Sequence, residues 1–409
     1  RLRVVKTMVG GLAGLLAHRG ITVFRANAAF HADETAPATS NHIVHLVPSP
    51  DQSDILTYHK ADVPEPSGPT MDLTATNIVI ATGAKPRPLP GNPFAGALID
   101  STQALEVNEF PSSAVIIGAG AIALEFASMW NAAGSKVTLL IRKDRVLSAW
   151  DRRAGTTLTR ELKRHGVNII TRASVTHVDT GANLGATVHY TCEGQDGEQS
   201  VWGEIALVAI GRDPITDPAW GVTIDDHGHV ATDAYGRTDK PGVWAVGDVT
   251  AGHALAHRAF EQGIVIAETI AGLNPKPVDE ATVPQIVFSF PEAASVGLTV
   301  EQAQAREDLI EIKETNYPML ANARMLMSGT AGSLTIVSGC DADNPDTPRV
   351  LGVHMVSQMA SDIIAEAEQL VGNHVPLADA ARLVHPHPTF SETLGEALLK
   401  ADGRPLHTR

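Results

Sequence analysis

A glycine turn between an apolar strand and an apolar helix constrains the fold of this chain more than any other feature. Residues 114–117 read Ala-Val-Ile-Ile, Gly118 and Gly120 follow, and an apolar-rich stretch then runs to Ala133. Another apolar run covers residues 136–141. Strand, glycine turn, helix and strand in this order are typical of the opening of a doubly wound α/β nucleotide-binding fold.

The small residues of this turn have the spacing of a dinucleotide site. Gly118 permits a tight turn, Gly120 lets the backbone approach a pyrophosphate, and Ala123 takes the position that packs the helix on the strand. The N-terminus of the helix then stabilises the phosphate charge. We therefore expect these three residues to bind a dinucleotide.

The end of the second strand of such a unit selects between NAD and NADP. An acidic residue there binds the ribose 2′-hydroxyl, whereas an arginine accommodates a 2′-phosphate. Residues 141–143 read Ile-Arg-Lys, and the first acid is Asp144. Arg142 therefore favours NADP, with two solvated charges before a loop as the alternative.

A second candidate nucleotide site follows the apolar run 243–246, where Gly247 and Asp248 precede a helix expected from about Ala254. An aspartate at the carboxyl end of a strand accepts hydrogen bonds from a sugar hydroxyl. Nearby, His253 and His257 have the spacing of zinc motifs, but no glutamate follows His253 and no third ligand is evident. We expect no metal site in this chain.

Residues 385–392, HPHPTFSE, are the most distinctive stretch. Two prolines fix the loop, and a helix is expected to begin at Ser391. Glu392 follows His387 by five residues, so its carboxylate can orient the ring and stabilise its charged form, as for a general base with a partner. A rigid turn with an incidental histidine is the open alternative.

The composition excludes several functions. Arg and Lys number 31 against 46 Asp and Glu, and the net charge of −15 is a poor match for nucleic acid or an anionic membrane. Cys192 and Cys340 are too few for a disulfide scaffold, and so few thiols fit a cytoplasmic protein. No apolar run approaches the roughly 20 residues of a membrane span. The basic and apolar start of the chain has the shape of a secretory signal, but its helical spacing predicts an amphipathic helix.

Taken in order, the motifs resemble those of the pyridine nucleotide-disulfide oxidoreductases, the family that contains dihydrolipoamide dehydrogenases and glutathione reductases. Residues 78–91 resemble the flavin-domain turn, and 115–127 resemble the nicotinamide-binding motif. Residues 208–214 resemble the end of that domain, 242–249 the second flavin motif, and 385–392 the signature of the dimerisation domain. The resemblance covers essentially the whole chain.

The resemblance implies an α/β fold with two Rossmann-like nucleotide-binding domains and a C-terminal α+β dimerisation domain. The expected bounds are 1–110 for a FAD-binding domain that is incomplete at its N-terminus, 111–229 for the NAD(P)-binding domain, 230–278 for the return segment of the FAD domain and 279–409 for the dimerisation domain. The residues expected to bind cofactors are Thr82, Gly83, Gly118, Gly120, Ala123, Glu125, Arg142, Val175, Gly211, Gly247, Asp248, Ala254, Leu255, Ala256 and His257.

The resemblance also implies a homodimeric flavoenzyme that uses FAD and NAD or NADP. HPHPTFSE looks most like dihydrolipoamide dehydrogenase, with His387 as the base and Glu392 as its partner in oxidising a small dithiol such as lipoamide, carried by a 2-oxo acid dehydrogenase complex. Residues 139–151 instead resemble glutathione reductase, an NADP enzyme, although Ser148 stands where a second arginine would fall.

Two motifs of the family have no counterpart in the 409 residues: the GxGxxG flavin motif and the CxxxxC redox disulfide. We expect the family's N-terminal segment to be missing, and this chain to be inactive in disulfide exchange and to hold FAD weakly. Two alternatives stay open. The first is another NAD(P)H-dependent flavoprotein reductase, acting on a disulfide or a quinone, and the second is a catalytically silent dimerising fragment.

Overall fold

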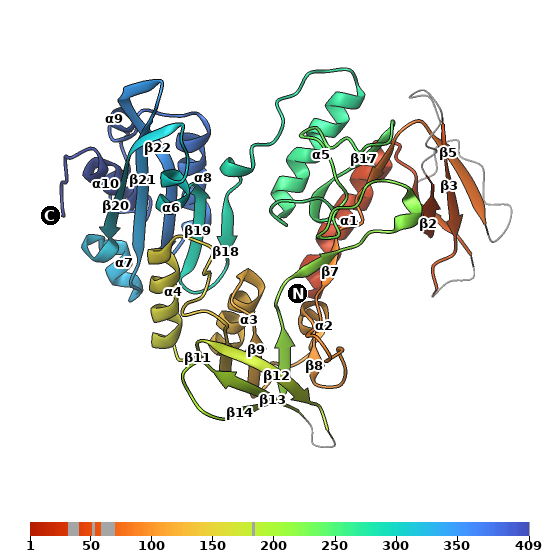
Figure 1. Cartoon of the computed structure of the whole chain (residues 1–409), viewed down its shortest axis with the longest axis horizontal. Coiled ribbons are helices and arrows are strands. Elements are labelled where there is room, and N and C mark those ends of the chain that lie inside the picture. Colours follow the sequence, from red (N-terminus) through yellow and green to blue (C-terminus); the bar gives the residue numbers. More distant parts are fainter. Residues whose placement is uncertain (32–40, 51–53, 59–69, 182–184, 409) are drawn as a thin grey trace. The chain divides into compact units, whose positions relative to one another are not determined.

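A computed structural model describes residues 1–31, 41–50, 54–58, 70–181 and 185–408 (Figure 1). The composition of residues 35–41 and 64–69 predicts polar or proline-rich connections there, and apart from Asn41 these residues lie outside the described ones. Contacts divide the chain into two compact units, one of residues 1–84 and 214–278 and the other of residues 85–213 and 279–409. The bounds of the four segments expected from the sequence stay predictions.

The first unit contains short sheets and two long helices. Its elements are α1 (Leu2–His18), β1 (Val23–Arg25), β2 (Asn27–Phe30), β3 (His42–Val47), β4 (Leu56–Tyr58), β5 (Met71–Ala75), β6 (Ile78–Ile80), β17 (Val243–Ala245) and α5 (Ala256–Ile270), with the 3-10 turns η1 (Pro218–Trp220) and η2 (Gly247–Val249). Strands β2, β3 and β5 form an antiparallel sheet, whereas β6 and β17 pair in parallel. Phe30 stacks on Trp220 at 6.0 Å between ring centroids.

Helix α1 is the amphipathic helix that the sequence predicts. In the described structure none of its residues is buried, and Leu2, Met8 and Leu12 are each more than half exposed. Among the described residues, no helix combines the length and the apolar composition that crossing a bilayer requires.

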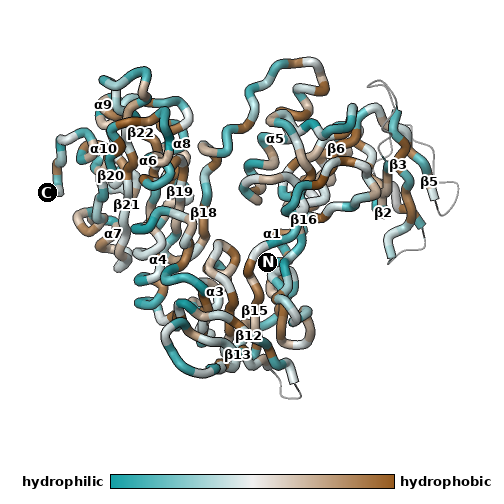
Figure 2. Tube along the Cα trace, viewed as in Figure 1, coloured by the Kyte–Doolittle hydropathy of each residue, from teal (hydrophilic) through white to brown (hydrophobic). Residues whose placement is uncertain are grey.

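The second unit begins with the nucleotide-binding part that the glycine turn predicts. Its elements are β8 (Leu98–Ile99), α2 (Ser101–Glu106), β9 (Ser113–Ile117), α3 (Ala121–Ala132), β10 (Lys136–Leu140), α4 (Arg152–Arg164), β11 (Asn168–Ile170), β12 (Ala173–Asp179), β13 (Ala186–Cys192), β14 (Gln199–Gly203) and β15 (Ile205–Val208). A parallel sheet has the strand order β11-β10-β9-β15-β8. Parallel strands buried on both faces are almost continuously apolar, as the colouring of β15 in Figure 2 illustrates.

Alternate residues of the parallel sheet serve two cores. Ile116 and Leu207 pack with α3 and α4, where Leu124 and Leu158 are fully buried. Residues of the opposite face, such as Val115, pack against the antiparallel sheet β12-β13-β14. The parallel sheet therefore lies between helices and a second sheet, and this packing holds the turn after β9 in place.

The C-terminal part of the second unit is an antiparallel sheet covered by helices. Its elements are β18 (Gln285–Val287), β19 (Glu292–Gly297), α6 (Val300–Gln304), β20 (Leu309–Pro318), η4 (Met319–Ala321), α7 (Ala323–Ser328), β21 (Ser333–Asp341), β22 (Asn344–Ser357), α8 (Ala360–Gly372), α9 (Leu377–Ala380) and α10 (Glu392–Ala401). The strand order is β18-β19-β22-β21-β20. The expected α+β character of the C-terminal region is confirmed. The spacing of Thr299 and Gln302 in the sequence predicts a capping box, which the structure confirms at the start of α6.

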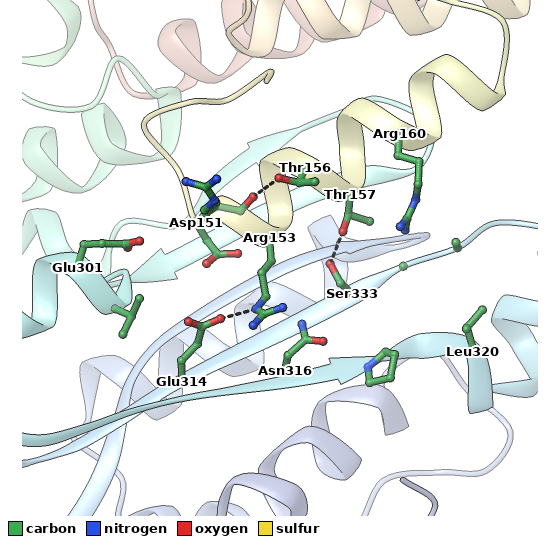
Figure 3. Close-up of a pocket in the computed structure, with 15 residues that line it drawn as sticks. Asp151, Arg153, Thr156, Thr157, Arg160, Glu301, Glu314, Asn316, Leu320 and Ser333 are labelled. Atoms are coloured by element: carbon green, nitrogen blue, oxygen red, sulfur yellow. Dashed lines mark hydrogen bonds and ion pairs between the residues drawn. The ribbon is translucent and has the colours of Figure 1, made fainter. Parts of the chain in front are cut away.

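A cavity of about 590 Å³, lined by charged, polar and apolar residues, lies between α4 and the C-terminal sheet (Figure 3). Arg153 extends from α4 to Glu314 of β20, at 2.5 Å, and Ser333 of β21 donates a hydrogen bond to Thr157 at 3.1 Å. These bonds fasten the nucleotide-binding part to the C-terminal part within one unit. None of the lining residues is a site residue predicted from the sequence.

Candidate functional site

The turn after β9 has the geometry of a dinucleotide-binding turn. Gly118 has a φ of +140°, and a Cβ at this position would lie 2.2 Å from the carbonyl oxygen of Ala209. Gly120 precedes α3, is exposed, and has no heavy atom within 4 Å of the place that a Cβ would take. Ala123 is fully buried under the helix. The residues therefore fit a dinucleotide, because the N-terminus of α3 is open to a pyrophosphate.

The other residues predicted to bind the nicotinamide cofactor follow β10 and β15 or lie on β12. Arg142 follows β10 and is exposed, whereas Arg145 is held by Asp144 at 3.2 Å. Gly211, which has a φ of +133°, follows β15. Val175 is half-buried on β12 and packs against the core below that sheet. Their predicted contacts with the cofactor stay predictions.

Glu125 lies on α3 and is half-buried. Burial raises the pKa of this carboxyl, and a hydrogen bond from the backbone N–H of Phe288, at 3.1 Å, acts in the opposite direction. A carboxyl in such surroundings is held in one orientation and is easier to protonate than a solvated one.

The flavin motifs predicted from the sequence lie at one edge of the β6–β17 sheet. Ile80 pairs with Ala245, so the turn at Thr82 and Gly83 and the turn at Gly247 both follow the carboxyl ends of adjacent parallel strands. Ligands of open α/β sheets bind outside this edge. These residues therefore fit a nucleotide cofactor such as FAD.

The other predicted flavin residues follow directly. Asp248 is half-buried in η2, Ala254 and Leu255 lead into α5, and Ala256 and His257 form its first turn. The amide of Gly247 is satisfied by Gln262 of α5 at 3.0 Å. The start of α5 is thereby fixed beside η2 within the same unit.

The loop before α10 brings His387 and Glu392 together. His387 Nδ1 lies 2.7 Å from Glu392 Oε2, and the His387 side chain is 79% exposed. A carboxylate only accepts hydrogen bonds, so Nδ1 carries the proton and Nε2 keeps its lone pair. The pair therefore has the arrangement of a general base with its orienting acid.

His385 has a different environment in the same loop. Its Nε2 lies 2.9 Å from Glu366 of α8, and only 9% of its side chain is exposed. The hydrogen bond that His385 donates to the Glu366 carboxylate raises the pKa of His385, while burial opposes the rise. His385 fastens the loop, whereas His387 is presented to solvent.

Asn322 is a residue of this site that sequence reasoning missed. It is 3% exposed, and its Nδ2 donates to Glu392 Oε1 at 2.8 Å and to the carbonyl of Thr389 at 2.9 Å. Its own Oδ1 caps α7 by accepting from Met325 N at 3.0 Å. The cap position before α7 was a visible signal, but nothing in the sequence connects it with residues almost seventy positions later.

Comparison with known proteins gives consistent results over most of the chain. Residues 3–263 match the sequence model described as pyridine nucleotide-disulphide oxidoreductase, and residues 283–398 match the dimerisation domain of the same family. Dihydrolipoyl dehydrogenase of Cupriavidus necator is 37% identical over 342 residues, which are 82% of this chain and 70% of that protein. Dihydrolipoyl dehydrogenase of Geobacillus stearothermophilus is 31% identical over 99% of this chain and 79% of its own length.

Solved structures show a similarity over most of this chain as well. LpdA from Mycobacterium tuberculosis is similar with a TM-score of 0.76 and 25% identity, over 91% of this chain and 76% of that chain. The HOCl-induced flavoprotein disulfide reductase RclA from Escherichia coli is similar with a TM-score of 0.70 and 27% identity, over 80% of this chain and 74% of that chain.

Proposed function

Because this chain belongs to the pyridine nucleotide-disulphide oxidoreductase family, a family of FAD- and NAD(P)-dependent enzymes, we propose that its reaction is the oxidation of a dihydrolipoyl dithiol. The observation that carries this proposal is the exposed His387 held by Glu392 at 2.7 Å. The relatives named dihydrolipoyl dehydrogenase support the choice of substrate.

His387 accepts the proton of a substrate thiol at Nε2 in this proposal. The thiolate is the reactive nucleophile, so proton removal starts the reaction. Glu392 stabilises the imidazolium that forms, and Asn322 holds Glu392 in position. Bound FAD would supply the two-electron relay between the thiols and the nicotinamide.

The redox disulfide is not among the residues of this sequence. In the described structure Cys192 lies on β13 and Cys340 on β21, both as free thiols, and burial raises the pKa of Cys340. We therefore assign the base and the nicotinamide site to these 409 residues and not the disulfide. The match to the dimerisation domain supports a homodimer. As part of the proposal, His387 serves the site of the partner subunit.

Arg142 favours NADP as the nicotinamide cofactor, because an exposed guanidinium after β10 can bind a 2′-phosphate in a bidentate manner. A low-molecular-weight disulfide as the alternative substrate is supported by the similarity to RclA, which is named a disulfide reductase. A quinone is the other alternative substrate. We place the enzyme in the cytoplasm, in keeping with its two cysteines.

The test uses the protein expressed from its complete gene. Dihydrolipoamide-dependent reduction of NAD and NADP is measured for the wild type and for His387→Gln. Turnover that falls by about 10²–10⁴-fold in the variant supports the proposal. Activity with glutathione disulfide or a quinone alone would instead identify the alternative reductase, and a folded dimer without activity would identify a silent module.

A further inference from the structure

Four side chains that no part of the proposed reaction uses gather on the outer face of the sheet β12-β13-β14. They are His177 and Asp179 of β12, His189 of β13 and Glu198 next to β14, and we call them the histidine cluster. Val188 and Tyr190, the neighbours of His189, are buried in the core on the opposite face. Because side chains alternate along a strand, His189 points to the solvent side.

An irregularity in β12 brings the two histidines opposite each other. Val175 pairs with Tyr190, and regular pairing would next place Thr176 opposite His189. The register shifts, however, and His177 takes that place. Such a bulge adds one residue and re-aims the side chains that follow. It leaves Val175 and Val178 packed on the core and puts His177 and Asp179 on the same face as His189.

The two rings lie face to face with a carboxylate at each edge. Their centroids are 4.0 Å apart and their planes differ by 8°. At the Nε2 edge, Asp179 Oδ2 lies 3.1 Å from His189 and 3.8 Å from His177. At the Nδ1 edge, the Glu198 carboxylate lies 3.6 Å from His189 and 3.8 Å from His177.

Against the expectation from the sequence that this chain has no metal site, we propose that His177, His189 and Asp179 bind a divalent transition-metal ion such as Zn²⁺. The ligands would be the two Nε2 atoms and one Asp179 oxygen, with water in a fourth position. Two imidazoles and a carboxylate suit Zn²⁺, Ni²⁺ or Cu²⁺ better than Mg²⁺ or Ca²⁺, which prefer oxygen ligands.

The three ligand atoms can reach the spacing that a zinc ion requires by side-chain movement alone. Ligand atoms on a tetrahedral zinc ion are about 3.3 Å apart, as follows from Zn–N and Zn–O distances of about 2.0–2.1 Å. The ligand atoms of these three residues already lie within 4.8 Å of one another. The parallel rings must tilt so that their lone pairs converge, and His177, which is 46% exposed, has room to do so.

Glu198 has the position of a supporting acid. A histidine that binds a metal through Nε2 carries its proton on Nδ1, and a carboxylate commonly accepts this proton. Glu198 lies beside both Nδ1 atoms and is itself held by the hydroxyl of Thr176 at 2.7 Å. An ion bound at the histidine cluster would therefore join all the strands of this sheet.

Zinc titration of the 409-residue chain by calorimetry, with a competing chelator, tests the proposal. We expect one Zn²⁺ per chain, and a dissociation constant at least tenfold higher for His177→Gln, His189→Gln and Asp179→Asn. Glu198→Gln should raise the dissociation constant for Zn²⁺ about tenfold, as is common for residues that form hydrogen bonds to a metal-binding histidine. Co²⁺ should give the absorption of a four-coordinate site with the wild type and not with His189→Gln.

The matched control is His45→Gln. His45 on β3 and Asp72 on β5 face each other across antiparallel strands at 2.6 Å and are similarly exposed, but they offer one histidine instead of two. This variant should keep the full zinc affinity. If His45→Gln weakened binding as much as His177→Gln, or if folded His177→Gln bound zinc like the wild type, the assigned site would be wrong. Since the cluster lies apart from His387, either result leaves the proposed reaction untouched.

Discussion

Asn322 donates a hydrogen bond to Oε1 of Glu392 at 2.8 Å, and the other oxygen of the same carboxylate lies 2.7 Å from His387 Nδ1. The buried amide of Asn322 thus holds the Glu392 carboxylate in place, and this carboxylate in turn orients the His387 ring. Because Asn322 also caps α7, its orientation is set by the backbone and not by the loop it supports. The position of His387 therefore depends on a helix start far away in the sequence.

Asn322→Ser tests this dependence. Serine retains the capping oxygen but removes the Nδ2 donor, so α7 should persist while Glu392 loses its anchor. A hydrogen bond to a charged group contributes about 1.5 kcal/mol, which corresponds to about tenfold in rate. We expect dihydrolipoamide to reduce the complete enzyme about tenfold more slowly in stopped-flow experiments, with an altered pH profile. Asn373→Ser, at the exposed end of α8, is the control and should change neither the rate of reduction by dihydrolipoamide nor its pH profile.

His387→Gln should act on one half-reaction only. Loss of a general base typically costs about 10²–10⁴-fold, so reduction by dihydrolipoamide should slow by this factor while reduction by NAD(P)H stays nearly unchanged. Glu392→Gln should cost less, because it removes an orienting charge and leaves the proton acceptor. Equal slowing of both half-reactions, or a larger effect of His385→Gln, would show that the loop is structural.

His385 should contribute to stability in a pH-dependent manner. Its pKa is raised in the folded protein by Glu366, so its contribution is complete below the unfolded pKa of about 6.5 and is lost as pH rises through the folded value. His385→Gln should therefore lower the free energy of unfolding more at about pH 5.5 than at about pH 9. Urea unfolding at both values measures this. If His385→Gln lowered the free energy of unfolding equally at both pH values, or more at the higher one, the pairing of His385 with Glu366 would be contradicted.

Local and distant features differed in how well the sequence predicted them. The β9–α3–β10 unit was predicted because Gly118, Gly120 and the apolar runs beside them act within one stretch of chain. Strand β20 was missed because it lies at the edge of its sheet, where half of its residues are exposed and its apolar pattern is weak. The contact of Asn322 with Glu392 joins segments that are distant in the sequence, so no local pattern encodes it. The register shift before His177 depends on how β12 pairs with β13, and the pattern of β12 alone does not show it.

Arg142→Glu should reverse the choice of nicotinamide cofactor. Arg142 is exposed directly after β10, where a 2′-phosphate would be bound, and a charged hydrogen bond contributes about 1.5–3 kcal/mol. We expect the dissociation constant for NADPH to rise by at least about tenfold, with that for NADH unchanged or lowered, in fluorescence titrations of the 409-residue chain. Lys143→Glu is the neighbouring control for a general loss of positive charge. Equal changes in the dissociation constants for NADPH and NADH would show that Arg142 does not bind the adenosine part of the cofactor.

Alanine substitutions at Gly118 and Gly120 should separate folding from binding. The Cβ of Gly118→Ala would meet the carbonyl of Ala209 at 2.2 Å in a left-handed backbone, so we expect a loss of about 2 kcal/mol or more in the free energy of unfolding.

Gly120 has a φ of −90° and open space where a Cβ would point. Gly120→Ala should therefore unfold at nearly the wild-type temperature, but its methyl group would occupy the approach to the N-terminus of α3 and weaken NAD(P)H binding by at least about tenfold. Thermal unfolding and NAD(P)H titration on both variants check the two effects. If Gly120→Ala bound NAD(P)H as well as the wild type does, the pyrophosphate would not lie on this turn.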